Sequence, residues 1–367
     1  MIDTRPAPSP LAAQLDHLTR LLRGNGDGQS PVGLAALCVG LVGLFSVLMP
    51  DRFPTLGTAQ SMMFQLPELG LLALAMVIPL ISSGLNLAII ATANQSALLM
   101  AFIMTKAIAP GSEPAIVALW IAVALAAGFV HCLVVGLATG WLVANMGVHP
   151  ILVTLGTMSI IDGVSIYLTR GLVIAGFPDA FQAIGNAVIL GLPLPFLIFV
   201  AVAALVAVIL SRTPFGISVA MIGSNLEATR YSGVDTKRVL IGVYTMSSVL
   251  CFVAAVLMMA RFNSASAGYA QSYLLVTILA AVLGGVDPNG GFGRVSGLVM
   301  ALIVLQVISS GLNQLGANQH LTLAIWGLTL IGVMAIRSIA TALAQRRSAR
   351  GTSLSVSKSN PTPQEKT

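Results

Sequence analysis

Long apolar runs separated by short polar connections dominate this chain. Residues 115–130 and 188–210, for example, contain no charged residue. Because a helix needs about 20 mostly apolar residues to cross a bilayer, such runs indicate membrane-spanning helices. The pattern predicts ten spans, of which the eighth is short and could be broken or tilted. They cover residues 32–49, 66–84, 87–107, 115–141, 149–169, 187–210, 239–260, 272–286, 295–315 and 321–337.

The composition agrees with this reading of the pattern. Apolar residues make up 56% of the chain and charged residues 8%, whereas soluble domains carry about 25% charged residues. A soluble protein with these helices would also need polar outer faces, which they lack. The predicted fold class is therefore an all-α, polytopic membrane protein, with membrane lipid as one partner.

The positions of Lys and Arg predict the orientation in the membrane. With the N-terminus in the cytoplasm and ten spans, fourteen basic residues fall inside and four outside. This asymmetry follows the positive-inside rule and predicts that both termini are cytoplasmic. The net charge of +6 does not indicate nucleic-acid binding, because the basic residues lie in loops and tails that flank the spans.

Three regions follow from this topology. Residues 1–31 form a cytoplasmic N-terminal segment, in which residues 11–23 predict an amphipathic helix, lying on the membrane surface or packed on the protein. Residues 32–337 form the transmembrane domain, with a cytoplasmic loop over 212–238. Residues 338–367 are polar and rich in Ser, and we expect this cytoplasmic tail to be disordered.

One short repeat is visible. The sequence ISSGLN occurs at residues 81–86 and again at residues 308–313. Both copies are expected to close a span, and the two spans run in opposite directions. Such a pair indicates a possible inverted repeat, whose interface would hold the substrate path. The alternative explanation is chance, because a chain built largely from a few apolar residue types repeats short sequences by coincidence.

The stretch GSNLEATRYSG, residues 223–233, is unusually polar for this chain. Ser224 and Glu227 have the spacing of a capping box, and Gly233 suits the left-handed residue that ends a helix. Glu227 and Arg230 are placed to pair at i, i+3 and to suit the helix dipole. The stretch predicts a cytoplasmic helix of about two turns. So short a helix is marginal alone and must dock on something, either its own membrane domain or a second protein.

Glu227, Ala228 and Thr229, followed after three residues by Gly233, resemble the EAA-x3-G loop of permease subunits of ATP-binding cassette importers. Thr229 replaces the second Ala of that pattern. The flanking segments 212–247, 148–171 and 279–297 resemble ribose, xylose and arabinose permeases of this class. The resemblance runs from about the second span to the tenth.

The resemblance implies a permease subunit in the bacterial inner membrane that imports a sugar or related polyol. It implies partners: ATPase subunits, a periplasmic sugar-binding protein and a second permease subunit, in a homodimer or a heterodimer. The loop would act as a coupling helix seated on the ATPase. The residues implied for coupling are Gly223, Ser224, Asn225, Glu227, Ala228, Arg230 and Gly233.

Polar residues inside spans are costly and face a cavity or a neighbouring helix, so they are candidates for the substrate path. The candidates are Asn86, Asn94, Gln95, Asp162, Gln306 and Asn313, with Asn263 and Gln271 at the outer mouth. Amides suit a neutral polyol, because each offers a donor and an acceptor. Interhelical hydrogen bonding is the competing role for each. Asp162 is expected to pair with a polar group on another helix.

Two departures from the family concern the substrate. Asn86 stands where these permeases usually carry an aspartate, and Asp162 where they often carry a basic or small residue.

Other chemistries have little support in the sequence. The Gly-rich segment 284–297 lacks the spacing of a phosphate-binding loop, so ATP and magnesium are expected only on the partner ATPase, with no cofactor on this chain. The His and Cys residues form no metal-ligand pattern, and no catalytic residues are indicated, so we expect no enzyme activity. The main alternative is a secondary transporter or channel, which would place ionisable residues at mid-membrane, where Asp162 is nearly the only one noted. A membrane adaptor or scaffold would not need a capped cytoplasmic helix.

Overall fold

The computed structural model describes residues 31–109, 111–318 and 320–332. The chain divides into two compact units at Gln319, and the described part of the second is the helix His320–Gly332. The predictions for residues 1–30, including the amphipathic helix 11–23, and for the tail 338–367 lie outside the described residues.

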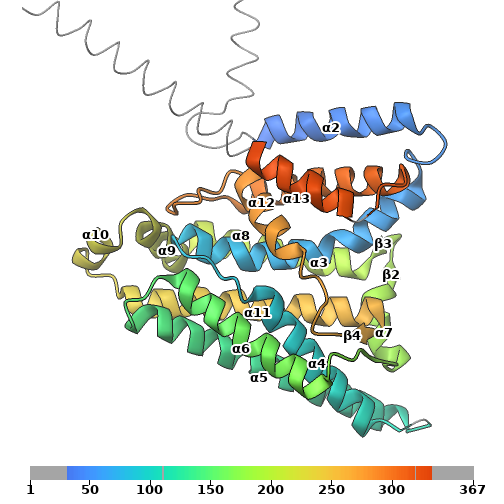
Figure 1. The fold of residues 1–367 in the computed structure, drawn as a ribbon, viewed down its shortest axis with the longest axis horizontal. Helices are drawn as coiled ribbons and strands as arrows, with labels where there is room; N and C mark the ends of the chain where they lie inside the picture. Colours follow the sequence, from blue (N-terminus) through green and yellow to red (C-terminus); the bar gives the residue numbers. More distant parts are fainter. Residues whose placement is uncertain (1–30, 110, 319, 333–367) are drawn as a thin grey trace, which may run out of the picture. The chain divides into compact units, whose positions relative to one another are not determined.

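The described chain is built from helices, as the apolar pattern predicts (Figure 1). Nine helices of the first unit overlap the first nine predicted spans. They are α2 (Pro31–Leu48), α3 (Leu56–Ile81), α4 (Ile89–Ala107), α5 (Pro114–Asn145), α6 (Pro150–Thr169), α8 (Leu194–Arg212), α11 (Thr236–Phe262), α12 (Tyr273–Leu283) and α13 (Val295–Gln314). Seven of the described helices are long and apolar enough to cross a membrane. The count of ten spans and the location of both termini stay predictions.

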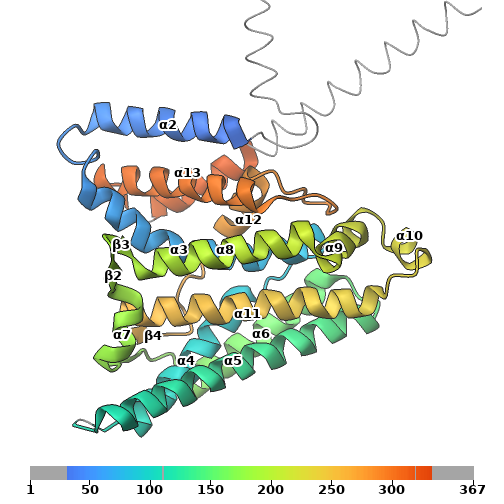
Figure 2. The ribbon, with the colours of Figure 1, turned by 180° about the vertical axis from the view of Figure 1, so that it is seen from behind.

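Helix α3 forms the centre of the first unit. Every residue from Leu66 to Ile81 is buried, and α11, α8, α12 and α13 all pack against it. Helix α11 in turn packs closely along α5 (Figure 2). Glycines on α5 permit this approach: a Cβ atom at Gly140 would lie 2.8 Å from the Ile241 Cα atom, and one at Gly136 would lie 2.7 Å from the Thr245 Cα atom. Small residues allow membrane helices to bring their backbones together.

The peripheral helices leave their apolar side chains uncovered by this chain. In the most apolar windows of α5, α6 and α8, only 22%, 17% and 22% of the residues are buried. Because lipid tails solvate apolar side chains as well as a protein core does, such helices are stable at the lipid-facing surface of a membrane protein.

Two predicted span boundaries were wrong. Helix α3 begins at Leu56 rather than at 66, and the Thr55 side chain caps it by accepting a hydrogen bond from the Thr58 amide at 3.2 Å. Helix α8 begins at Leu194 rather than at 187, because β2 (Val188–Ile189) pairs with β3 (Leu192–Pro193) in a tight hairpin. Leu190 and Gly191 at its turn have positive φ angles, which end any helix there.

The two ends of the first unit differ in structure. One end carries the short helix α7 (Asp179–Asn186), the β2–β3 hairpin and the antiparallel pairing of β1 (Ile174–Ala175) with β4 (Ser264–Ala265). The other end carries α9 (Pro214–Ser224) and α10 (Leu226–Tyr231) (Figures 1 and 2). The α9–α10 end is the one that the positive-inside rule predicts to be cytoplasmic.

Candidate functional site

Helix α10 is the predicted cytoplasmic helix, and its true cap lies one residue beyond the predicted one. The Asn225 side chain accepts a hydrogen bond from the Ala228 amide at 2.9 Å. The Ser224 hydroxyl instead donates to the Ala220 carbonyl at 3.1 Å, inside α9. The capping box from Ser224 to Glu227 was therefore wrong. Asn225 has extended backbone angles, which make it the N-cap, whereas Ser224 is still helical.

The end of α10 matches its prediction. Gly233 has a φ angle of +84°, the left-handed conformation that favours glycine, and its amide donates to the Arg230 carbonyl at 3.1 Å. Two residues later, Asp235 caps α11 by accepting from the Arg238 amide at 3.2 Å. The helix is therefore delimited at both ends by its own sequence.

Helix α10 is held to the rest of the chain by one buried residue. Thr229 is 2% exposed, and its hydroxyl donates to the Asn225 carbonyl at 2.7 Å. Glu227, Ala228 and Arg230 are exposed, and Tyr231 is 89% exposed. The predicted Glu227–Arg230 ion pair is not formed among the described residues. Both charges are consequently available to a partner.

An open pocket of about 470 Å³ lies beside α10. Its lining comes from the end of α8, from α9, from the α10 segment and from Gly291 of the Gly-rich connection between α12 and α13. It includes Met221, Ala228 and Thr229. The lining from the α10 segment, residues 225–232, is small and mostly polar, and the charged Glu227 and Arg230 are not part of it.

Three connections meet at the base of α10 through backbone atoms. The Gly291 amide donates to the Ile81 carbonyl, at the end of α3, at 2.8 Å. A Cβ atom at Gly223 would collide with that carbonyl and with the Gly291 nitrogen, and one at Gly290 would lie 2.6 Å from the Ser83 nitrogen. We call Ile81, Ser83, Gly223, Gly290 and Gly291 the glycine joint. It connects the end of α9 directly to the central helix α3.

The two ISSGLN copies have different conformations. The first follows α3 as a nonhelical stretch, in which Ser83 has a φ angle of +62°, whereas the second lies wholly inside α13. Both copies close a helix as expected, since α3 ends at Ile81 and α13 at Gln314, and the inverted repeat stays a prediction.

Four of the eight candidate path residues are tied into the fold by hydrogen bonds. The Asn86 amide donates to Ser247 Oγ at 2.9 Å, and Asn86 Oδ1 accepts from the Ala88 amide at 3.1 Å. Asn94 donates to the carbonyls of Ala267 and Tyr269, at 2.9 and 2.8 Å. The other two fixed residues are Gln306, bonded to Gln65 and Ser310, and Asn263, bonded to the Phe177 amide.

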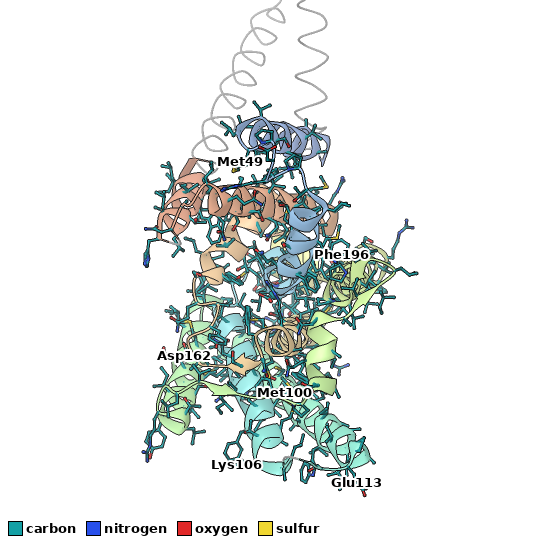
Figure 3. The ribbon with its side chains drawn as sticks, turned by 90° about the vertical axis from the view of Figure 1, so that its right-hand side faces the viewer. Met49, Met100, Lys106, Glu113, Asp162 and Phe196 are labelled. Carbon is teal, nitrogen blue, oxygen red and sulfur yellow. The ribbon has the colours of Figure 1, made fainter. Side chains whose placement is uncertain are left out.

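The other four candidates have side chains without a hydrogen bond among the described residues. Gln95 and Asp162 are partly buried, whereas Gln271 and Asn313 are exposed. The partner expected for Asp162, which lies on α6 (Figure 3), is therefore not found within the described part of the chain. The geometry separates the candidates that hydrogen-bond within the fold from those that do not do so among the described residues. A role in the substrate path stays a prediction for all eight.

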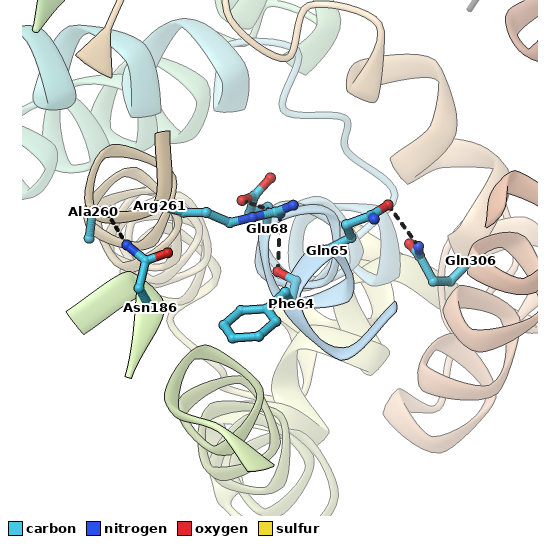
Figure 4. Close-up of polar contacts among 7 residues, drawn as sticks. All are labelled: Phe64, Gln65, Glu68, Asn186, Ala260, Arg261 and Gln306. Carbon is cyan, nitrogen blue, oxygen red and sulfur yellow. Dashed lines mark hydrogen bonds and ion pairs between the residues drawn. The ribbon is translucent and has the colours of Figure 1, made fainter. Parts of the chain in front are cut away.

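A buried ion pair between two apolar helices, α3 and α11, was not among the predicted residues. Glu68, at the middle of α3, accepts from Arg261 Nη1 at 2.7 Å, and the same nitrogen donates to the Phe64 carbonyl at 3.1 Å (Figure 4). The side chain of Glu68 is 3% exposed and that of Arg261 23%. The only signal in the sequence was a glutamate after Pro67 inside an apolar run. The expectation that Asp162 is nearly the only ionisable residue at mid-membrane missed Glu68, at the middle of α3.

The long apolar helices, the buried centre and the exposed capped helix define a multi-pass membrane protein of the transporter class. Residues 58–334 match the family described as "Branched-chain amino acid transport system / permease component". The Autoinducer 2 import system permease protein LsrD of Yersinia enterocolitica is 30% identical over 316 residues, which cover 84% of this chain and 91% of that protein. LsrD of Yersinia pseudotuberculosis is 31% identical over 278 residues, with 74% and 80% covered. No solved structure matches the chain significantly.

The chain belongs to this permease-component family. It is a permease subunit of an ATP-binding cassette importer, a multi-pass protein of the bacterial inner membrane. The resemblance drawn from residues 212–247 and the other segments is confirmed.

Proposed function

We propose that this permease forms the path for a small hydroxylated solute, a sugar or a related polyol. A periplasmic binding protein delivers the solute, and a separate ATPase drives its passage. ATP and magnesium belong to that ATPase, and this chain carries neither a cofactor nor enzyme activity. A second permease subunit, identical or related, completes the path. The relatives are named for autoinducer 2 import, which favours a small solute.

The observation that carries this proposal is the exposure of α10. A helix of six residues is not stable by itself in water, and this one buries only Thr229 against its own chain. Its caps keep it helical, while Glu227 and Arg230 remain unpaired among the described residues. A docking surface on the ATPase explains why a preformed, charged helix is kept at this position.

The glycine joint provides the path by which movement of α10 reaches the membrane core. Close-packed backbone contacts are stiff, because no flexible side chain separates the segments. A displacement of Gly223 therefore moves Ile81 and the buried helix α3. Glu227, Arg230 and their neighbours receive the force, and α3 transmits it.

Glu68 gives the secondary-transporter alternative one supporting observation, since ion-coupled transporters use intramembrane carboxylates. Its pairing with Arg261 at 2.7 Å favours a fixed charge pair over a group that exchanges ions. The two functions differ in their energy source: the importer needs ATP, whereas a secondary transporter needs an ion gradient.

The test is solute uptake by the assembled importer in proteoliposomes, with ATP inside, in the presence and absence of an ionophore. Glu227→Gln should lower uptake about tenfold, because hydrogen bonds to charged groups contribute about 1.5–3 kcal/mol. The matched control is Glu113→Gln, an exposed glutamate that precedes α5 and makes no capping hydrogen bond. Uptake that needs an ion gradient and ignores ATP contradicts the proposal, as does unchanged uptake by the Glu227 variant.

A further inference from the structure

An open pocket of about 460 Å³ lies where α11 ends and α12 begins. It falls within the usual size of small-molecule sites, about 300–1,000 Å³. No part of the coupling machinery touches it. Its lining residues are Phe262, Ser264, Tyr269, Ala270, Ser272 and Tyr273.

The pocket extends from β4, at one end of the first unit, inward to the start of α12. Helix α12 has 11 residues and thus spans about 16 Å, roughly half of the hydrocarbon core. Its far end, at Gly284, packs against Gly297 at the start of α13, on the side of the Gly-rich connection. Tyr273, at its near end, therefore lies well inside the bilayer. Asn94 of α4 holds the preceding loop there, through Ala267 and Tyr269.

A nonhelical loop at this depth is tolerated only where protein buries it or where it lines a water-filled cavity. The loop between α11 and α12 is also strained, since Asn263 and Ala270 have φ angles of +49° and +55°. Strained backbone that the surrounding structure maintains is concentrated at functional sites. The loop therefore has the features of a cavity wall that the fold maintains at an energetic cost.

The pocket offers hydroxyl groups and aromatic rings. Ser264 Oγ and the Tyr269 hydroxyl are 2.8 Å apart. The Ser272 and Tyr273 hydroxyls have no hydrogen-bond partner among the described residues, although Ser272 occupies the N-cap position of α12. A hydroxyl can both donate and accept, so two free hydroxyls suit a solute that carries several hydroxyl groups. The rings of Phe262 and Tyr269 supply apolar faces.

The charges beside the pocket cancel each other. The Arg261 guanidinium lies 5.5 Å from the Phe262 ring centroid and pairs with Glu68, and Tyr273 lies near enough to interact with both charges. A buried pair is costly to break, because it leaves an uncompensated charge. A charged or zwitterionic solute would therefore find no unpaired charge from this pair, whereas a neutral solute needs none.

We propose that this pocket is an intramembrane transit site for a neutral, polyhydroxylated solute, held by the hydroxyls of Ser272 and Tyr273. The inference rests on the proposed function and names the site and the ligand class within it. The described lining residues include no charged side chain to pair with the ammonium or carboxylate group of an amino acid, which disfavours the branched-chain amino acids for which the family is described.

The experiment uses the assembled importer, with its ATPase, second permease subunit and binding protein, in proteoliposomes. The probes are radiolabelled D-ribose, D-xylose, L-arabinose and autoinducer 2, with L-leucine as the zwitterionic comparison. For the transported probe, the number of ATP molecules hydrolysed per solute imported is measured. Tyr273→Phe and Ser272→Ala should each raise this ratio about fivefold, since each removes one hydrogen bond to the solute.

Matched controls come from the exposed surface of α6. Tyr167 is 83% exposed, and the Ser159 hydroxyl bonds only to the Leu155 carbonyl of its own helix. Tyr167→Phe and Ser159→Ala should leave the ratio at the wild-type value. A merely structural role for the pocket residues would lower ATP hydrolysis and uptake together and leave the ratio unchanged, which would overturn the proposal. Substitution of Glu68 is avoided as the primary test, because breaking a buried pair can unfold the protein.

The outcomes separate the two proposals. ATP-driven uptake by the wild type with unaltered ratios in both pocket variants overturns the transit site and leaves the importer function intact. ATP-driven uptake of L-leucine but of none of the hydroxylated probes overturns the ligand class. No ATP-driven uptake of any probe by the wild type contradicts the proposed function and the site that rests on it.

Discussion

Replacement of Asn225 by alanine should loosen α10, whereas replacement of its neighbour Ser224 should not. Asn225→Ala removes the only side-chain acceptor at the N-terminus of α10, which bonds the Ala228 amide at 2.9 Å. Loss of an N-cap costs about 1 kcal/mol, within a range of about 0.5–2. Helix α10 has little with which to offset this loss, since it is six residues long and buries only Thr229.

The expected effect can be worked from the amides that α10 protects. The Thr229 amide donates to the Asn225 carbonyl and the Ser232 amide to the Ala228 carbonyl, both at 3.1 Å. A loss of about 1 kcal/mol raises the population of the open helix about fivefold. Hydrogen exchange of these two amides should therefore accelerate about fivefold in Asn225→Ala.

The matched variant tests the position of the cap. Ser224→Ala removes only a bond from the Ser224 hydroxyl to the Ala220 carbonyl, a type of bond that adds little to a helix. Its effect on exchange in α10 should stay within about 0.5 kcal/mol, roughly a factor of two. Faster exchange in Ser224→Ala with no change in Asn225→Ala would refute this reasoning and restore the capping box predicted from the sequence.

Three further predictions concern packing and loop position. Gly140→Ala should lower the unfolding temperature of the purified protein, because the new Cβ atom would meet the Ile241 backbone at 2.8 Å and overpacking costs about 1–3 kcal/mol. The control Gly163→Ala, whose Cβ atom would have no neighbour within 4 Å, should not lower it. Gly223→Ala should reduce ATP-driven uptake through the collision at Ile81, with Gly163→Ala again as control, and normal uptake would contradict the role of the glycine joint. Asn94→Ala should speed hydrogen exchange in residues 266–270, because Asn94 bonds the Ala267 and Tyr269 carbonyls of this segment. Gln95→Ala should not, and equal exchange in both variants would contradict the role of Asn94 as the anchor of the loop.

The fold was largely predictable because its signal is local. An apolar run long enough to cross a bilayer forms a helix whatever its neighbours are. The orientation drawn from the Lys and Arg positions stays a prediction. Two boundaries were predicted wrongly because local polarity does not follow the helix ends there. Polar residues within 56–65 made the predicted start of α3 too late, and the apolar hairpin 188–193 made the predicted start of α8 too early.

The candidate site was only partly predictable, because several roles depend on partners distant in sequence. Glu68 gains its significance from Arg261, which is 193 residues away. Asn94 and Gln95 are adjacent amides, and they differ in role only because the distant loop at Tyr269 packs within hydrogen-bond reach of Asn94. The one-residue shift of the cap to Asn225 reflects backbone angles that two neighbouring polar residues do not reveal.

The docking of α10 on the ATPase is the central claim, and cross-linking tests it most directly. A photoreactive residue is placed at Glu227 in the assembled importer, and the same residue is placed at Glu113, before α5, as the control. The account predicts a cross-link from position 227 to the ATPase, with a yield that changes when ATP binds, and none from position 113. Equal labelling from both positions, or no ATPase cross-link from position 227, would contradict it.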